Sequence, residues 1–350
     1  MEKVVNTPEN REASACPLLS IVVIGRNEGA RLHRCLQSIS SIDYLSPKPE
    51  LIYVDSGSTD GSPEVARSFG AQVIVLNAAR PTAALGRNAG WPLAKGKFIL
   101  FLDGDTMLHA DFPRRAMETI SLDPAIAAVW GNLKEIHPEA SIYNRILDLD
   151  WIYPPGETEF CGGNVLMRKQ AIEACGGYDA GLIAGEEPEL CRRMRAAGYR
   201  IIHIDAPMAG HDLGMKHFSQ YWKRSVRSGH AYAEVSRRFR ETDDPFWQAE
   251  HKRSLIRGIF WTASICLAMI LTAAARSVTP LLLWIVLLLL ASLRSAWNAR
   301  WKSSRMSLLI LYGMHSQLQQ IPICLGELQY AYHQYVGKHR PLIEYKNVPE

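Results

Sequence analysis

The sequence lacks the features that mark secreted, disulfide-linked and repetitive proteins. It has 7 cysteines, with no CxxC pair and no spacing typical of a metal site, so we expect free thiols in a reducing compartment. Residues 1–17 are polar and contain no apolar core of signal-peptide length, which predicts a flexible tail and neither cleavage nor export. No internal repeat or low-complexity tract is present.

Charge is also scarce, at 21% of residues, and its distribution is uneven. Residues 1–220 carry 22 Lys and Arg against 27 Asp and Glu, whereas residues 221–340 carry 16 against 6. An acidic front and a basic rear indicate two different environments. An anionic membrane surface is the partner we expect for the basic part, with no role in nucleic-acid binding.

Short apolar runs alternate with helical patterns at the front of the chain. The runs are Leu18–Ile24, Leu51–Val54, Val73–Leu76 and Phe98–Leu102. This alternation predicts an α/β fold with a mostly parallel, Rossmann-like sheet and helices on both faces. Ligands bind such sheets beyond the carboxyl ends of the strands. Polar clusters follow three of the runs, at 26–28, 55–60 and 103–105, so we expect a site there.

Two long apolar segments begin near residue 255. Leu255–Ala275 contains one charged residue, Arg257, and Val278–Leu293 contains none. Their lengths are near the roughly 17–25 residues that cross a bilayer as a helix, so we expect a membrane hairpin over residues 255–297. Basic residues flank both outer ends, which predicts that these ends and the preceding domain are cytoplasmic. A hairpin buried in a soluble core and a re-entrant hairpin remain alternatives.

Beyond the hairpin, apolar residues recur at spacings of three and four, which predicts one amphipathic helix. Pro322 is expected to kink this helix. Because several glutamines interrupt the pattern, we expect the helix to lie at the membrane interface or on the hairpin rather than to form a third span. The apolar positions are Leu311, Met314, Leu318, Ile321, Leu325 and Leu328.

The most informative short motif is Asp103-Gly104-Asp105, directly after the run FILFL. Residues two apart on an extended chain project to the same side, about 6–7 Å apart, so the two carboxylates repel each other unless a cation lies between them. Mg²⁺ prefers carboxylates, waters and substrate phosphates as ligands. We therefore predict that the pair holds a metal that binds a diphosphate. A helix cap at the strand end is the alternative reading.

The order of motifs along the chain strengthens this prediction. The succession SIVVIGRNE, YVDSGSTDGS, GRNAG, FLDGD, FCGGNVLMRK and GEEPELCRRMRAAGYRI resembles family 2 glycosyltransferases with the GT-A fold, over residues 18 to about 212. The resemblance implies an inverting, Mg²⁺- or Mn²⁺-dependent transfer of a sugar from a nucleotide diphosphate to an acceptor hydroxyl.

The resemblance also implies roles for individual residues. Donor binding falls to Glu28 and Asp55 at the nucleotide, and to Arg87, Asn88 and Asp103 at the diphosphate. Where the family commonly has two consecutive Asp residues, this chain has Asp55 followed by Ser56, which weakens the assignment of the donor's nucleobase. The metal ligands would be Asp105, Asp103 and His211, and the acceptor side of the sugar pocket would be formed by Gly162, Gly163 and Asn164.

The family's general base corresponds to Glu187, with Glu186 as the second candidate. The family usually has Asp at the position of Glu187, and Glu is one methylene longer. Pro188 and the following helical pattern place both acids at a helix N-terminus, where the helix dipole favours the ionised form. Alternatively, both residues only complement the helix dipole and have no catalytic role.

One departure from the family concerns processivity. Polymer-forming members carry QxxRW before the membrane region, whereas this chain has Gln220-Tyr-Trp-Lys-Arg224 without the tryptophan. We therefore expect single transfers. The basic segment from Lys223 to Arg240 is expected to contact anionic headgroups, an acceptor lipid phosphate, or only solvent.

These observations predict five parts: a tail (1–17), a GT-A catalytic domain (18–240), a linker (241–254), the hairpin (255–297) and an interfacial helix with its tail (298–350). We expect a membrane-anchored enzyme with a cytoplasmic active site, a UDP-linked sugar donor and a lipid-linked or surface-glycan acceptor. A nucleotidyltransferase and a non-catalytic membrane scaffold are the alternatives. The pattern predicts no particular sugar, acceptor or oligomeric state.

Overall fold

The computed structural model describes residues 17–337, so most of the expected tail lies outside the described residues. All four predicted strands are present: β1 (Leu19–Gly25), β2 (Glu50–Asp55), β3 (Gln72–Val75) and β4 (Phe98–Asp103). They run parallel in the order β3-β2-β1-β4. Their side chains are apolar on both faces because helices cover both sides of the sheet.

The register of these strands places three polar clusters at one edge. Gly25 of β1 pairs with Asp55 of β2, and Ile24 pairs with Asp103 of β4. The loops that follow β1, β2 and β4 therefore leave the sheet side by side. This is the arrangement that the sequence predicts for the site.

The second half of the sheet mixes strand directions. β8 (Val165–Arg168) runs antiparallel between β4 and β6 (Ile126–Glu135), and β6 runs parallel to β9 (Arg200–His211). The two edge strands β5 (Thr106–Leu108) and β7 (Gly156–Glu157) each pair antiparallel with β9. The helices of this domain are α1 (Ala30–Ser40), α2 (Ser62–Ser68), α3 (Ala83–Gly90), α4 (Phe112–Ser121), α5 (Ile142–Leu147), α6 (Lys169–Ala174) and α7 (Glu186–Ala196).

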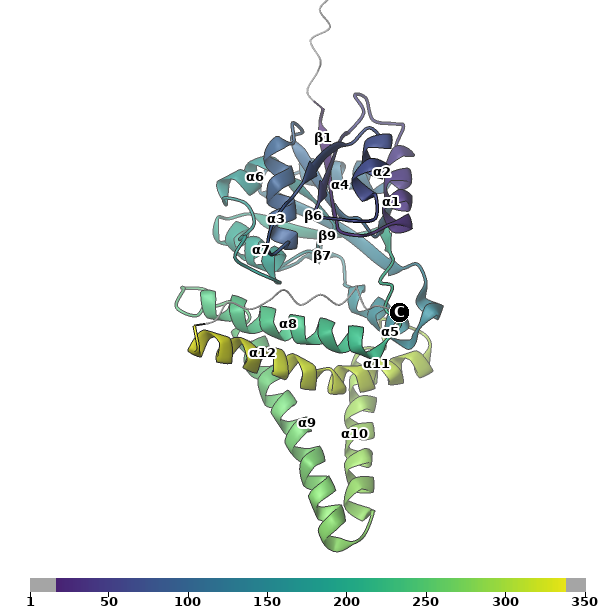
Figure 1. Cartoon of the computed structure of the whole chain (residues 1–350), viewed down its shortest axis with the longest axis vertical. Coiled ribbons are helices and arrows are strands. Elements are labelled where there is room, and N and C mark those ends of the chain that lie inside the picture. Colours follow the sequence, from purple (N-terminus) through teal and green to yellow (C-terminus); the bar gives the residue numbers. More distant parts are fainter. Residues whose placement is uncertain (1–16, 338–350) are drawn as a thin grey trace, which may run out of the picture.

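Five longer helices form the rest of the molecule. α8 (Phe218–Arg238) lies below the α/β domain, and α12 (Gln320–Tyr335) runs alongside it (Figure 1). α9 (Gln248–Ala275) and α10 (Thr279–Asn298) project away as a hairpin that begins seven residues before the expected position 255. α11 (Met306–Leu318) precedes α12.

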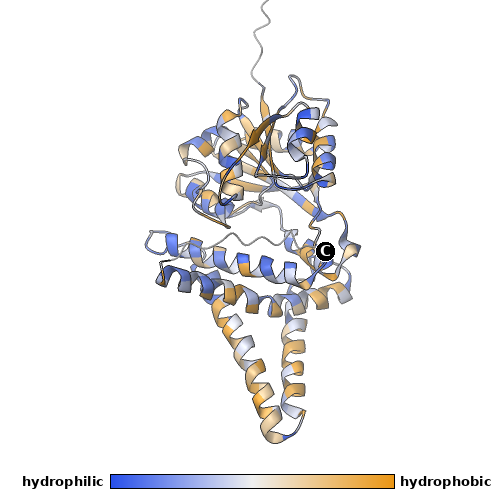
Figure 2. Cartoon of the chain, in the orientation of Figure 1, coloured by the Kyte–Doolittle hydropathy of each residue, from blue (hydrophilic) through white to orange (hydrophobic). Residues whose placement is uncertain are grey.

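The hairpin helices are long and apolar enough to cross a membrane, and only 17% of the most apolar window of each is buried. Large side chains such as Leu267, Ile270 and Leu283 face outward, 56%, 63% and 64% exposed. Figure 2 shows that hydrophobic residues occupy most of both helices. A hairpin packed inside a soluble core would bury these side chains, so the structure does not support that alternative.

The C-terminal helical segment differs from its prediction in two respects. It is divided into α11 and α12 near Gln319, and Pro322 lies in the first turn of α12, where proline is tolerated. Glu327 of α12 is also buried, on a face that it shares with Ile323, Cys324 and Tyr330, and it accepts hydrogen bonds from Ser254 and His251 of α9, at 2.5 and 3.1 Å. Leu325 and Leu328 are exposed instead, as on a helix that lies against lipid.

Candidate active site

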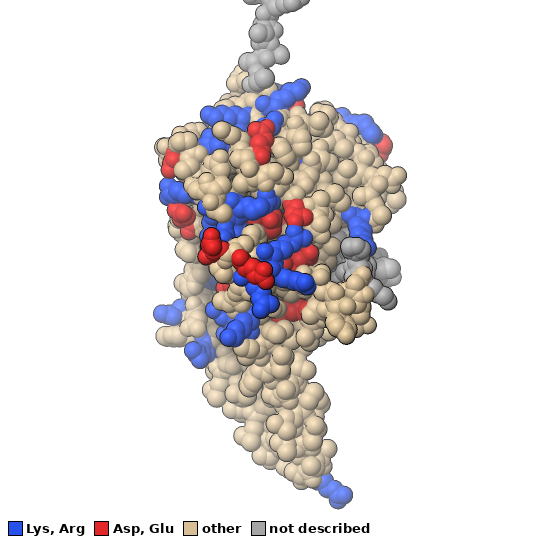
Figure 3. Space-filling model, turned by 90° about the vertical axis from the view of Figure 1, so that its left-hand side faces the viewer, with Lys and Arg blue, Asp and Glu red and all other residues tan. Residues whose placement is uncertain are grey.

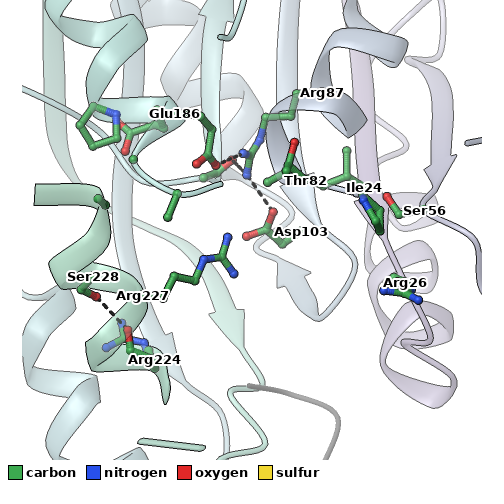
Figure 4. Close-up of a pocket in the computed structure, with 18 of the residues that line it drawn as sticks. Ile24, Arg26, Ser56, Thr82, Arg87, Asp103, Glu186, Arg224, Arg227 and Ser228 are labelled. Carbon is green, nitrogen blue, oxygen red and sulfur yellow. Dashed lines mark hydrogen bonds and ion pairs between the residues drawn. The ribbon is translucent and has the colours of Figure 1, made fainter. Parts of the chain in front are cut away.

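A cavity of ≈ 560 Å³ opens where the strand-end loops of the sheet face α7 and α8. Its walls come from distant parts of the chain: Glu28 follows β1, Asp103 ends β4, Glu187 begins α7 and Arg227 belongs to α8. Figure 4 shows these elements around one opening, with Arg227 directed toward Asp103 from α8. Figure 3 shows basic and acidic side chains gathered at this level of the molecule.

Arg87 lies at the centre of the site and is only 2% exposed. Its guanidinium donates one hydrogen bond to Asp103 at 2.9 Å and another to Glu186 at 2.8 Å (Figure 4). Burial would lower the pKa of Arg87, but the neighbouring negative charges outweigh it and raise the pKa instead. Arg87 is therefore a fixed cation that holds β4 and the start of α7 in register.

The glycine and asparagine that follow Cys161 support this ion pair. A Cβ at Gly163 would lie 2.5 Å from a guanidinium nitrogen of Arg87, so only glycine leaves room for the pair. The Asn164 side chain accepts a hydrogen bond from the backbone N–H of Asp103 at 2.9 Å. Gly163 lines the cavity, whereas Gly162 does not. The space left by the absent Gly163 side chain, which the sequence suggests for a sugar, is occupied by the Arg87 guanidinium.

Asp103, Asp105 and His211 come together as the sequence predicts. One ligand atom from each lies within 4.8 Å of the others. Pairing between β5 and β9 places Thr106 opposite His211, which brings the imidazole to the Asp105 carboxylate at 3.5 Å. Gly104 leaves little room for a side chain between the acids, because a Cβ there would lie 3.2 Å from Glu28 and from the backbone of Ile24. Two carboxylates and one imidazole form a donor set that suits a divalent cation.

Glu186 and Glu187 are the first residues of α7, as expected, but their environments differ. Glu186 bonds to Arg87, whereas Glu187 is 7% exposed and accepts hydrogen bonds from the Cys161 N–H at 2.7 Å and the Cys191 thiol at 3.2 Å. Burial raises the pKa of Glu187 to about 7, despite these hydrogen bonds. Desolvation is the larger effect at Glu187, and it opposes the stabilisation of the ionised form that is expected at a helix N-terminus.

The predicted nucleotide residues lie in different positions relative to the cavity. Glu28 lines it and forms an ion pair with Arg31 at 2.9 Å. Asp55 is fully buried, and its carboxylate accepts hydrogen bonds from the N–H groups of Gly57 and Ser58 at 3.0 and 2.7 Å. Asp55 shapes the loop after β2 and does not line the cavity.

Asn88 also points away from the opening. Its amide group donates to the backbone oxygen of Tyr178 at 2.6 Å and accepts from the backbone N–H of the same residue at 3.0 Å. It also accepts from the indole of Trp91 at 3.0 Å. Asn88 therefore ties α3 to the segment before α7, while its neighbour Arg87 faces the site.

Sequence reasoning missed one whole wall of the cavity. Arg224, Arg227 and Tyr232 of α8 and Trp247 after it all line the opening. The available signal was the basic segment that begins at Lys223, which the sequence assigns to headgroups, an acceptor phosphate or solvent without deciding among them. Contact between α8 and the sheet edge depends on the tertiary fold and has no local pattern.

Comparison with known proteins gives the class of this fold and site. Residues 20–176 match the family model described as glycosyl transferase family 2. The mannosyltransferase PcManGT from Pyrobaculum calidifontis, solved with GDP-Man and Mn²⁺, has a similar structure, with a TM-score of 0.61 and 21% identity over 85% of this chain and 86% of that one. The fold is thus of the GT-A type.

Curated relatives agree with this class. The chain is 26% identical to glycosyltransferase AglE of Haloferax volcanii over 231 residues, 63% of this chain and 75% of that protein. It is also 26% identical to β-monoglucosyldiacylglycerol synthase of Nostoc sp. over 183 residues, 47% of this chain but only 38% of that protein. The α/β part of the chain, residues 20–176, is thus of the glycosyltransferase family 2 type.

Proposed function

We propose that the protein is an inverting, metal-dependent glycosyltransferase that moves a sugar from a UDP-linked donor to a lipid-linked or surface-glycan acceptor. The main support is a shared opening. Asp103 lines the same cavity as Arg87 and Glu187, and its carboxylate also belongs to the cluster with Asp105 and His211. Asp103 therefore links the candidate cation site to the cavity that holds the fixed guanidinium and the candidate base, although Asp105 and His211 do not line that cavity.

Asp103, Asp105 and His211 are the proposed metal ligands. Their ligand atoms already lie within 4.8 Å of one another, so the residues present fit a divalent ion. Mg²⁺ strongly prefers oxygen ligands, and the imidazole therefore favours Mn²⁺. When bound, the ion would supply charge stabilisation at the leaving diphosphate. PcManGT was solved with Mn²⁺, which is consistent with this assignment.

Donor binding is assigned to the strand-end loops. Glu28 lines the cavity near the end of β1 and is suited to accept the imide N–H of uracil. Arg87 provides a permanent positive charge beside Asp103, where a diphosphate would lie. Asp55 and Asn88 act indirectly, because their side chains hold the loops in place.

Glu187 is the proposed general base. A base works best when its pKa lies near the working pH, and burial brings the pKa of Glu187 to about 7. It takes the proton of the acceptor hydroxyl as the oxygen attacks the anomeric carbon, and a single in-line displacement inverts that carbon. Glu186 is less suited to this role because its carboxylate is bound to Arg87.

The two candidate membrane helices support a location of this chemistry beside a membrane. Arg253 and Arg257 lie near the start of α9, and Arg294 and Arg300 lie at the end of α10, on the side of the α/β domain. By the positive-inside rule we assign this side, and the active site, to the cytoplasm. The opposite end of the hairpin carries only Arg276 as a charged residue.

The test is release of nucleoside diphosphate by the full-length protein in lipid, with a panel of UDP- and GDP-sugars. We expect one UDP-sugar to give release that requires Mn²⁺ and stops with a chelator. Release that is independent of metal would contradict the proposed cation site. If no donor is turned over and no nucleotide binds, the protein is the non-catalytic scaffold that the sequence left as an alternative.

A further inference from the structure

A second cavity of ≈ 500 Å³ lies between the α/β domain and the start of the hairpin. Arg224, Ser228 and Tyr232 of α8 line both this cavity and the active-site cavity. The two spaces therefore meet along one face of α8.

The second cavity is basic. Arg224, Arg253, Arg257 and Lys302 line it together with two acids, Asp150 and Glu250, so its formal charge is four minus two, or +2. The three arginines form no salt bridge with any carboxylate among residues 17–337. The Asp150 carboxylate, in contrast, accepts a hydrogen bond from Tyr312 at 3.0 Å. A phosphate monoester carries about −1.5 to −2 at pH 7, which complements this charge.

A third cavity of ≈ 440 Å³ continues from the second toward the hairpin. Arg257 lines both, and the third cavity adds the apolar side chains Leu287, Leu290 and Ala291 of α10. Figure 1 shows α9 and α10 diverging toward this end of the hairpin. The active-site cavity is lined by acidic and basic residues, the second cavity by basic and aromatic residues, and the third cavity in part by apolar residues.

We propose that the second cavity binds the phosphate of a lipid acceptor whose hydrocarbon chain lies between α9 and α10. The occupant is a lipid-linked diphosphate sugar, whose diphosphate diester carries two negative charges, and its sugar presents the acceptor hydroxyl to Glu187 past Arg224 and Tyr232. This inference rests on the function proposed for the active-site cavity, and it names the acceptor class and the residues that select it.

Binding of a radiolabelled long-chain prenyl phosphate to the full-length protein in phosphatidylcholine nanodiscs tests the proposal. Arg253→Gln and Arg257→Gln each remove an exposed cation from the cavity, and we expect each to weaken binding roughly tenfold or more. Lys252→Gln is the matched control, because Lys252 is also an exposed cation of α9 but does not line the cavity. We expect it to change binding by less than about twofold.

Two further arms identify the ligand chemistry. The corresponding prenol, which lacks phosphate, should not compete, and phosphatidylglycerol, a phosphodiester with a single charge, should compete at least about tenfold less well. Equal competition by phosphatidylglycerol, or an equal loss in Lys252→Gln, would show general attraction to an anionic surface and overturn the proposal.

Donor turnover, measured separately, distinguishes this inference from the proposed function. If prenyl phosphate binding depends on Arg253 and Arg257 while no nucleotide sugar is consumed, the lipid site stands and the enzymatic proposal fails. If a donor is consumed at the same rate with an acceptor that carries no phosphate, the enzymatic proposal stands and the lipid site is refuted.

Discussion

Apolar side chains are buried in the α/β domain but exposed in the hairpin. In the α/β domain, Ile21, Val22 and Phe101 are fully buried between the sheet and its helices. In the hairpin, Leu267 and Leu283 are more than half exposed, and hydrophobic residues occupy most of both helices (Figure 2). An apolar surface of this extent is not stable in water, so the hairpin requires lipid or another apolar partner.

Charged groups show the same contrast in reverse. The α/β domain holds Asp105, Arg87 and Glu187 at 2%, 2% and 7% exposure, at the ends of strands and helices where a ligand can compensate for their desolvation. The windows of α9 and α10 that can span a membrane carry almost no charge. Buried charge is therefore concentrated at the candidate site, and exposed apolar surface is concentrated on the two helices that are long and apolar enough to cross a membrane.

The largest effect is expected from removing charge at the end of β4. Asp105→Asn keeps the shape of the side chain but removes the negative charge from the cluster with His211. We expect transfer to fall by roughly 10³-fold or more, because a metal ion contributes several kcal/mol to the transition state. Steady-state transfer and Mn²⁺ binding by calorimetry measure it. Asp43→Asn, at an exposed carboxylate, should change neither, and full activity in Asp105→Asn would refute the cation site.

Glu187→Gln tests the second buried charge. Loss of a general base typically costs roughly 10²–10⁴-fold in rate. We expect a decrease of that size in kcat, with nucleotide binding unchanged. Glu186→Gln is the comparison: it weakens one contact of Arg87 and should act mainly on donor KM. If Glu186→Gln abolishes turnover and Glu187→Gln does not, the base has been assigned to the wrong residue.

The next largest difference is expected when a charged residue is introduced into the hairpin and, for comparison, into the α/β domain. Leu267→Arg places a guanidinium near the middle of α9, and on insertion scales this costs about 2.5–3.5 kcal/mol if the helix spans a bilayer. Leu122→Arg is the matched control, since Leu122 is 82% exposed in the α/β domain. We expect only the first to reduce the membrane-extracted yield of folded protein. Equal behaviour of the two variants would indicate that α9 is in water.

Much of the first half of the fold could be predicted because its signals are local. The four apolar runs correspond to β1–β4 within one or two residues, since parallel strands covered on both faces have continuous apolar sequences. Asp103, Asp105 and His211 were also grouped correctly, but only the resemblance to a family linked His211 to residues so far away in sequence.

The rest of the site depends on contacts with no local pattern. Arg224 and Arg227 line the cavity because α8 packs across the sheet edge, and a basic helix alone does not reveal what it faces. Glu327 is buried because Ser254 and His251 of α9 bond to it, so the periodicity of α12 pointed to the opposite face. In both cases a partner remote in sequence decides the orientation.

A smaller, graded effect is expected from pH. The carboxyl of Glu187 has an ordinary pKa of 4.5, raised to about 7 by burial, so the ionised base forms only as the pH rises through 7. We expect kcat/KM to rise about tenfold per pH unit below 7 and then level off. The pH–rate profile of Glu187→Gln should lack this rise below pH 7.

Stability should move in the opposite direction over the same range. Because the folded state binds the Glu187 proton more tightly than the unfolded state, its contribution to stability is complete below pH 4.5 and is lost as the pH rises to about 7. Denaturant titrations of the native protein and Glu187→Gln at pH 5 and 8 separate this contribution from others. A difference between the two proteins that does not change with pH would contradict the raised pKa.

The smallest predicted effect concerns the thiol beside the base. The Cys191 thiol donates to the Glu187 carboxylate at 3.2 Å, which favours the ionised form and partly offsets burial. Cys191→Ala removes this donor, so the midpoint of the pH–rate profile should move upward by a few tenths of a unit, with the plateau rate retained. Cys191→Ser supplies a hydroxyl donor and should restore the midpoint, and Cys175→Ala, remote from Glu187, should leave it unchanged. A downward shift in Cys191→Ala would mean that the thiol acts through packing and not through its hydrogen bond, because loss of a donor to a carboxylate can only disfavour its charged form.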